Sequence, residues 1–243
     1  MNIGLVGKYD LQDAYKSILE RLAHAGTYNA HKVHTHFINS EQITPENVAE
    51  KLSGLDGVVV CPGFGQRGIE GKITSIQYTR EHDIPTFGIC LGMRMMVIEF
   101  ARNVLGYADA NSREMDVKTP HNVIDIMEEQ KNITNMGGTM RLGAYECQIK
   151  EGSRPWEAYN HQDSVRERHR HRYEFNNNYK QEYEEKGMKC VGTNPESNLV
   201  EIVEIPTLKW FIGTQFHPEY SSTVLKPHPL FMSFVKACID NKK

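Results

Sequence analysis

The sequence has no apolar run that approaches the roughly 20 residues needed to cross a bilayer, so it predicts no membrane-spanning segment. It has no excess of basic residues either, and a formal net charge of −3 argues against a general nucleic-acid-binding protein. The N-terminus, MNIGLVGKYD, lacks the basic leader and cleavage site of a signal peptide. The five cysteines, an odd number at wide spacings without a C-x-x-C pair, predict reduced thiols in a cytoplasmic protein, with neither a disulfide framework nor a metal site.

The first half of the sequence alternates apolar strand patterns with helical patterns. Strands separated by helices predict an α/β fold with a doubly wound, mostly parallel central sheet flanked by helices. The expected strands are residues 3–7, 32–37, 57–61 and 85–89, and the expected helices are 10–25, 45–52, 67–82 and 91–105, the first of them ending before Gly26. The second half predicts a loop over 107–120, a smaller β-rich portion over 121–150 and 188–214, and a closing helix over 230–239.

Cys90 lies in the sequence GICLGMR, where an expected strand meets an expected helix. Glycines two residues before and two residues after the cysteine permit the sharp turn of a G-x-S-x-G nucleophile elbow. The N-terminus of the following helix lowers the pKa of a thiol, and the thiolate is the reactive form. Cys90 is therefore predicted to be a nucleophile, and the other four cysteines are predicted to be packing residues.

A thiol nucleophile needs a base, and the base usually needs an acid that orients it. The best candidates lie in FHPEY, which follows the strand pattern WFIGTQF. Pro218 favours extended geometry at His217, so His217 and Glu219 are expected to point to the same side. Glu219 can then fix the tautomer of the imidazole.

The basic run RERHRHR, residues 166–172, predicts two different faces if it is extended. One face would carry the four arginines (166, 168, 170 and 172), and the other would carry Glu167, His169 and His171. Four arginines cannot be buried without anions, so their face is expected at the surface or at an interface.

A G-x-C-x-G elbow at Cys90, followed much later by H-P-E at 217–219, makes the chain resemble the class I (triad) glutamine amidotransferases. The resemblance narrows to the glutaminase domain of CTP synthase and covers residues 1–243 as a single domain. The segments that carry it are VGKY (6–9) with DAYKSI (13–18), PGFGQRGIEGK (62–72), GGTMRLG (137–143), ERHRHRYEFNN (167–177) and QFHPEYSS (215–222).

The resemblance implies hydrolysis of L-glutamine to glutamate and ammonia through a glutamyl thioester, without a cofactor. Cys90 would be the nucleophile, His217 the proton relay and Glu219 its orienting acid. The N–H groups of Gly63 and Leu91 would stabilise the oxyanion. The remaining implied substrate-binding residues are Gly92, Met93, Arg94, Glu114 and Arg172, the last two binding the ammonium and α-carboxylate of glutamine. Phe64 and Arg67 are implied to meet GTP, the activator of the family.

The resemblance also implies a partner, the amidoligase domain of CTP synthase, which this chain lacks. That domain would use ATP and Mg²⁺ to aminate UTP with the ammonia, a step of pyrimidine biosynthesis, and the full enzyme is expected to be a homotetramer. The chain departs from the family at Arg94, where the family has glutamine, and in CPGFG, where the family has PGGFG. Two alternatives stay open: a regulatory or binding module of the same fold with impaired turnover, and a cysteine hydrolase of another amide.

Overall fold

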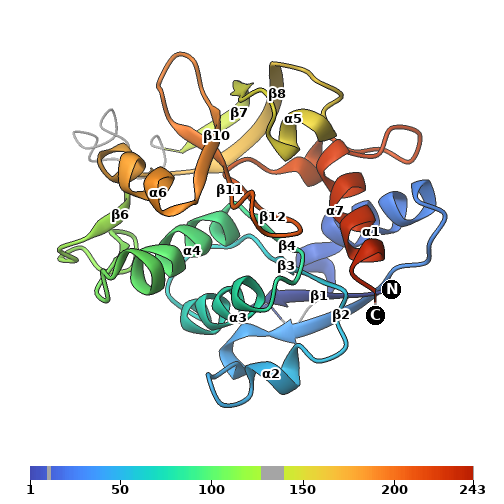
Figure 1. Ribbon diagram of the computed structural model, residues 1–243, viewed down its shortest axis with the longest axis horizontal. Coiled ribbons are helices and arrows are strands. Elements are labelled where there is room, and N and C mark those ends of the chain that lie inside the picture. Colours follow the sequence, from blue (N-terminus) through green and yellow to red (C-terminus); the bar gives the residue numbers. More distant parts are fainter. Residues whose placement is uncertain (10–11, 127–139, 243) are drawn as a thin grey trace.

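The structure is a computed structural model that describes residues 1–9, 12–126 and 140–242. The described residues form a nine-stranded sheet in the order β2-β1-β3-β4-β12-β11-β10-β7-β8 (Figure 1). Its first five strands are parallel: β1 (Asn2–Gly7), β2 (His34–Asn39), β3 (Gly57–Val60), β4 (Thr86–Ile89) and β12 (Phe211–Thr214). The remaining four are antiparallel: β7 (Arg141–Ile149), β8 (Ser164–His171), β10 (Lys189–Thr193) and β11 (Val200–Glu204).

The doubly wound α/β fold predicted from the first half is confirmed. The β-rich second half is not a separate layer, because β10, β11 and β12 follow one another through short connections and extend the same sheet. Such connections suit antiparallel neighbours, whereas parallel neighbours need a long crossover. A second, three-stranded sheet contains β5 (Asn111–Ser112), β6 (Asn122–Ile126) and β9 (Tyr173–Phe175).

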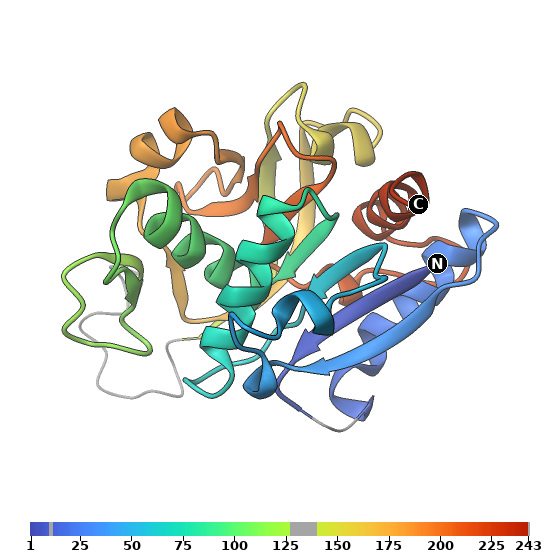
Figure 2. The same cartoon turned by 60° about the horizontal axis from the view of Figure 1, so that its bottom comes forward.

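Helices cover both faces of the parallel half (Figures 1 and 2). Helices α3 (Ile69–Glu81) and α4 (Leu91–Phe100) pack on one face, and α1 (Lys16–Tyr28) and α7 (Pro229–Asp240) pack together on the other. The side chains of β3 alternate accordingly: Val58 and Val60 belong to the first core cluster, and Val59 belongs to the second. Burial on both faces explains why GVVV reads as a continuous apolar run.

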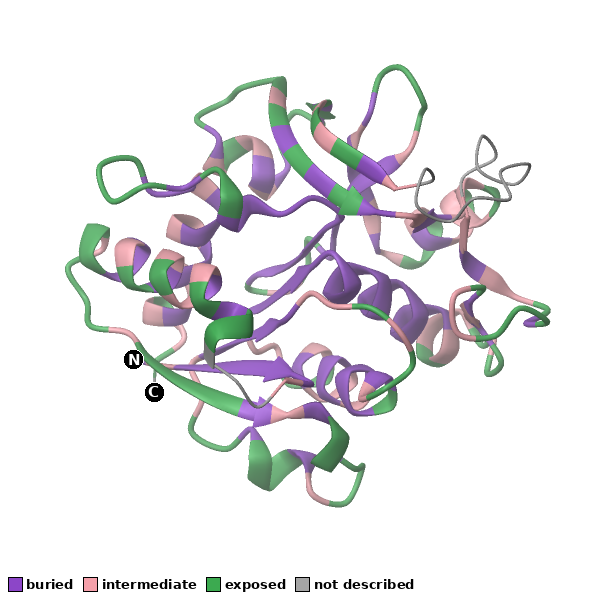
Figure 3. Ribbon diagram, turned by 180° about the vertical axis from the view of Figure 1, so that it is seen from behind, coloured by how far each residue is buried: buried purple, intermediate pink, exposed green. Residues whose placement is uncertain are grey.

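Three short helices lie outside this layered core, namely α2 (Val48–Lys51), α5 (Arg154–Ala158) and α6 (Lys180–Lys186). Figure 3 shows the contrast between the fully buried central strands and the surface elements, where buried and exposed residues alternate. In the part of the chain that the structure describes, no helix combines the length and the apolar character needed to cross a membrane.

The boundaries of the first predicted helix differ from the structure, whereas the predicted end of the helix over 91–105 is confirmed. Helix α1 begins at Lys16, after a 3-10 turn over Gln12–Tyr15, and it continues through Gly26 to Tyr28. Gly26 is needed for close packing and does not end the helix, because a Cβ there would lie 2.7 Å from the carbonyl oxygen of His31. Helix α4 passes into a π-helical turn over Ala101–Leu105 and ends at Gly106, which has φ 84°. The start of the predicted 10–25 helix and residues 137–139 of GGTMRLG lie outside the described residues.

Candidate active site

Cys90 occupies a strained turn between β4 and α4. Its backbone has φ 52° and ψ −99°, a region that residues other than glycine rarely adopt. The flanking glycines allow the helix to approach the sheet: a Cβ at Gly92 would lie 2.1 Å from the carbonyl oxygen of Val60, and one at Gly88 would lie 2.8 Å from the carbonyl carbon of Gly92. The predicted elbow is confirmed.

His217 and Glu219 reach Cys90 because β12 is the parallel neighbour of β4. Thr214 pairs with Ile89, and the N–H of Cys90 donates to the carbonyl of Thr214 over 2.7 Å. The carboxyl ends of parallel neighbours meet at one edge of a sheet, so the residues after Thr214 lie beside the cysteine. His217 Nδ1 is 2.7 Å from Glu219 Oε1, and both side chains are buried.

The contact between His217 and Glu219 is as predicted, but the predicted backbone is wrong beyond His217. That residue is close to extended, with φ −109° and ψ 87°, and the chain then enters a 3-10 turn over Pro218–Tyr220. The carboxylate therefore folds back onto the imidazole across a turn instead of lying beside it on one face of a strand.

Burial and charge act against each other on the Cys90 thiol. Burial favours the neutral thiol, but the positive charge of His217 and a hydrogen bond to it outweigh burial, and Arg94 adds to their effect, so the pKa of Cys90 falls below its usual value. In return, Cys90 and Glu219 overcome the burial of His217 and raise its pKa. Each of the two groups thus favours the charged form of the other.

The pKa values of the other four cysteines are shifted in the opposite direction. Burial raises the pKa of the Cys61 and Cys190 thiols to about 12, and it also raises the pKa of Cys147 and of Cys238. All four are buried and free of disulfides. They have the properties of packing residues, and Cys90 is the nucleophile candidate among the five.

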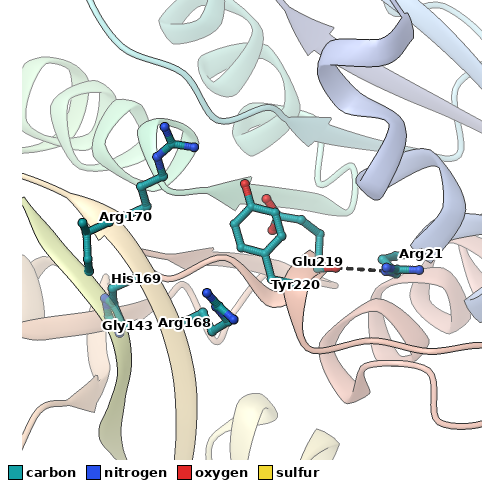
Figure 4. A pocket seen from close by; sticks show the side chains of 8 residues that line it. Arg21, Gly143, Arg168, His169, Arg170, Glu219 and Tyr220 are labelled. Atoms are coloured by element: carbon teal, nitrogen blue, oxygen red, sulfur yellow. Dashed lines mark hydrogen bonds between the residues drawn. The ribbon is translucent and has the colours of Figure 1, made fainter.

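Three side chains that the sequence analysis did not identify support this constellation. Tyr220 stacks on His217 with ring centroids 5.0 Å apart and planes at 14°, and Gln215 Nε2 lies 3.6 Å from Cys90 Sγ. Arg21, on α1, donates from Nε to the carbonyl of Glu219 over 2.9 Å. Both residues line a cavity of about 650 Å³ (Figure 4), which is not the pocket that contains Cys90. Gln215 and Tyr220 flank the HPE motif and could have been identified, whereas Arg21 lies 198 residues from Glu219 in the sequence.

Cys90 and His217 open into a pocket of about 610 Å³. Five of the other predicted site residues line it: Gly63, Phe64, Arg94, Glu114 and Arg172. Leu91, Gly92 and Met93 do not line it with side chains; they lie fully buried beneath the elbow, so their contribution through backbone groups stays a prediction. Arg67 lies outside the lining and pairs with Glu41 at 2.9 Å. The GTP contacts of Phe64 and Arg67 also stay predictions.

Arg94 is not at the surface. It is buried, and its Nη1 pairs with Glu114 Oε2 inside the pocket. The other carboxylate oxygen of Glu114 accepts from the N–H of Gly65 over 3.0 Å. The arginine that replaces the family glutamine thus holds the carboxylate that is predicted to bind the substrate ammonium.

Strand β8 shows the two faces predicted for the basic run. Its exposed face carries Arg166, Arg168 and Arg170, and its buried face carries Glu167, His169 and His171. The two buried histidines contact each other, with Nδ1 of His169 2.7 Å from Nε2 of His171. Arg172 follows the end of the strand, and there the chain turns it onto the pocket wall.

Comparisons with known proteins identify the family of this chain. Residues 10–237 match the family model of class I glutamine amidotransferases. The chain is 74% identical over 243 residues to a CTP synthase of Bacteroides thetaiotaomicron and 56% identical over 244 residues to one of Porphyromonas gingivalis. It is fully covered in both cases but spans only 45% of the length of either relative.

The chain is also similar to solved structures of glutamine amidotransferases. The glutaminase domain of Trypanosoma brucei CTPS with bound acivicin superposes with a TM-score of 0.93 at 37% identity, covering 99% of this chain and 94% of that one. A glutamine amidotransferase of Thermotoga maritima shares the fold alone, with a TM-score of 0.55 at 14% identity over 90% of this chain and 76% of that one. The chain therefore belongs to the class I glutamine amidotransferase family, as an enzyme domain of the CTP synthase glutaminase type.

Proposed function

We propose that this chain hydrolyses L-glutamine to glutamate and ammonia with Cys90 as nucleophile, His217 as proton relay and Glu219 as the acid that orients His217. The observation that carries the proposal is the buried contact of 2.7 Å between His217 and Glu219 beside a thiol of lowered pKa, in a pocket that Glu114 and Arg172 also line. A regulatory module of the same fold would not need a thiol of lowered pKa beside a buried imidazole in a pocket.

The reaction follows from these groups in two halves. The Cys90 thiolate attacks the side-chain amide carbon, a C–S bond forms, and the carbonyl electron pair moves to the oxygen. The C–N bond then breaks as His217 gives its proton to the leaving nitrogen, which releases ammonia and leaves a glutamyl thioester. Water attacks the thioester while His217 takes a proton from it, and cleavage of the C–S bond frees glutamate and restores the thiolate.

The pocket supplies groups of the right charge for the amino-acid head of glutamine. A carboxylate such as Glu114 suits the substrate ammonium, and the guanidinium of Arg172 can bind the α-carboxylate with two parallel hydrogen bonds. The N–H groups of Gly63 and Leu91 are assigned to the oxyanion. Leu91 is the first residue of α4, so its N–H is one of the four that have no partner within the helix.

The ammonia would serve a second reaction on the same enzyme. The chain spans less than half of its curated CTP synthase relatives, and we assign the remaining length to an amidoligase domain that aminates UTP to CTP with ATP and Mg²⁺. GTP would activate the glutaminase through Phe64 and Arg67. This chain is then one glutaminase domain of a cytoplasmic, homotetrameric enzyme.

The decisive test measures ammonia release from L-glutamine by the purified chain. We expect hydrolysis by the unsubstituted chain and only background release by Cys90→Ser, because a hydroxyl at this position ionises far less readily than the thiol. Cys190→Ser serves as the matched control, since Cys190 is a buried packing cysteine outside the pocket. Equal activity of Cys90→Ser and Cys190→Ser would refute the assignment of the nucleophile.

Replacing Arg94 by glutamine is expected to lower KM and raise kcat/KM for glutamine several-fold. In the structure the guanidinium holds Glu114 and places a positive charge where the substrate ammonium is to bind. A neutral amide frees the carboxylate and removes this repulsion. Arg102→Gln is the control, because Arg102 pairs with Glu70 away from the pocket. An unchanged kcat/KM in Arg94→Gln would show that the arginine does not compete with the substrate.

A further inference from the structure

Lys72 is a fully buried lysine beneath the pocket that the proposed mechanism does not use. It lies on α3 with none of its surface exposed, and its Nζ donates to the carbonyl oxygen of Cys61 over 2.5 Å. Among the described residues no carboxylate lies within 4.0 Å of this ammonium group. Burial lowers the pKa of Lys72 to about 8.

A buried cation without a counter-ion is costly to desolvate, and a hydrophobic side chain of similar length would fill the same space without that cost. The acidic groups closest to the reaction already have cationic partners, because Glu114 pairs with Arg94 and Glu219 contacts His217. The charge of Lys72 thus requires an explanation other than stability.

A second lysine contacts the other end of the loop segment that Lys72 contacts. Lys8 follows β1, is almost fully buried, and donates from Nζ to the carbonyl oxygen of Phe64. The carbonyls of Cys61 and Phe64 bracket Pro62 and Gly63, the segment to which the oxyanion role is assigned. The peptide after Phe64 is fixed at its other end as well, because the N–H of Gly65 donates to Glu114.

These contacts orient the peptide group between Cys61 and Pro62 and the one between Phe64 and Gly65, at the two ends of the segment. A peptide group is planar, so fixing its carbonyl also fixes its plane, and only two peptide groups remain between the fixed ones. Pro62 has no N–H, so between the two fixed peptide groups only Gly63 and Phe64 carry one, and the N–H assigned to the oxyanion is that of Gly63. Within the described part of the chain, that N–H has no hydrogen-bond acceptor.

We propose that Lys72 is a positioning residue for glutamine hydrolysis: with Lys8, it holds the segment Cys61–Phe64 so that the N–H of Gly63 faces the oxyanion formed at Cys90. The proposal rests on the proposed glutaminase function. Lys72 touches no reacting atom and acts through the loop. An oxyanion donor contributes only if it is aimed at the developing charge before the reaction begins, and ammonium groups on both flanking carbonyls provide that orientation.

The test is the Lys72→Met variant of the whole chain, compared with Ile76→Met on the same helix, which is equally buried but is part of the apolar core. We expect kcat for glutamine to fall at least tenfold in Lys72→Met, with KM within about twofold of the unsubstituted chain, because one donor to the oxyanion is worth roughly 10²–10³ in kcat. The control variant should keep its kcat. Lys8→Met should also lower kcat, since it releases the other end of the segment.

Alkylation of Cys90 by iodoacetamide separates positioning from general damage. This reaction needs the thiolate but no oxyanion hole, and the larger charges on the thiol come from His217 and Arg94. The maximal rate, reached once the thiol is ionised, should therefore be unchanged in Lys72→Met, with only a small rise in the pH of half-maximal rate because the charge of Lys72 also acts on Cys90. Thermal stability should be equal or higher. A wild-type kcat in Lys72→Met, or a parallel loss of alkylation, would overturn the proposal. Alkylation of the unsubstituted chain without any glutamine hydrolysis would instead refute the proposed function on which it rests.

Discussion

His217→Ala is expected to remove nearly all glutamine hydrolysis, whereas Glu219→Ala should leave a measurable remainder. The imidazole transfers protons in both halves of the reaction, and a positioned acid–base group is worth about 10²–10⁴-fold in rate. Glu219 only orients it, and two other contacts persist without Glu219: the ring stacks on Tyr220, and the His217 N–H donates to the carbonyl of Arg168 over 2.8 Å. Initial rates of ammonia release at saturating glutamine measure both losses.

A second measurement on the same variants concerns the thiol. The charge of His217 is the main influence that lowers the pKa of Cys90 against burial. Its removal should therefore raise the pH at which iodoacetamide alkylation reaches half its maximal rate. His161→Ala, at an exposed position, is the control. If Glu219→Ala proved as severe as His217→Ala in hydrolysis, the division of roles between base and orienting acid would be wrong.

The parallel half of the fold and the nucleophile elbow could be predicted because their signals are local. Continuous apolar runs such as GVVV mark strands buried on both faces, and the glycines at 88 and 92 mark the close approach of α4 to the sheet. The antiparallel extension could not be predicted, since strand patterns do not reveal which edge a strand will join. Tertiary contacts also determine where the first helix ends, because Gly26 serves close packing and the helix continues through it.

Within the site, the residues in recognisable motifs were predictable and their supports were not. Cys90, His217 and Glu219 stand in short patterns whose chemistry dictates their spacing. Lys72 donates to a carbonyl 11 residues away and Arg21 to one 198 residues away, and no sequence pattern connects such pairs. The pairing of Arg94 with Glu114 was equally hidden, because the acid lies beyond α4 in a segment predicted to be a loop.

Glu114→Gln is expected to weaken both glutamine binding and the fold, for two separable reasons. The substrate ammonium loses its charged acceptor, and hydrogen bonds to charged groups contribute about 1.5–3 kcal/mol, so KM should rise roughly 10- to 100-fold. Arg94 is left buried without an acid, and breaking this largely buried ion pair costs about 3 kcal/mol of unfolding free energy. The new amide oxygen can still accept from the N–H of Gly65, so the loop contact is retained.

The double variant Arg94→Gln/Glu114→Gln separates these reasons. Removing the guanidinium as well abolishes the unpaired charge, so urea unfolding should show most of the lost stability restored. KM should stay high, because the carboxylate that binds the ammonium is still missing. The single variant Arg94→Gln is expected to behave in the opposite way, because the carboxylate is present and freed, so KM should fall. A Glu114→Gln variant with unchanged KM would mean that the carboxylate serves only to neutralise Arg94, and the ammonium of glutamine would then need another acceptor in the pocket.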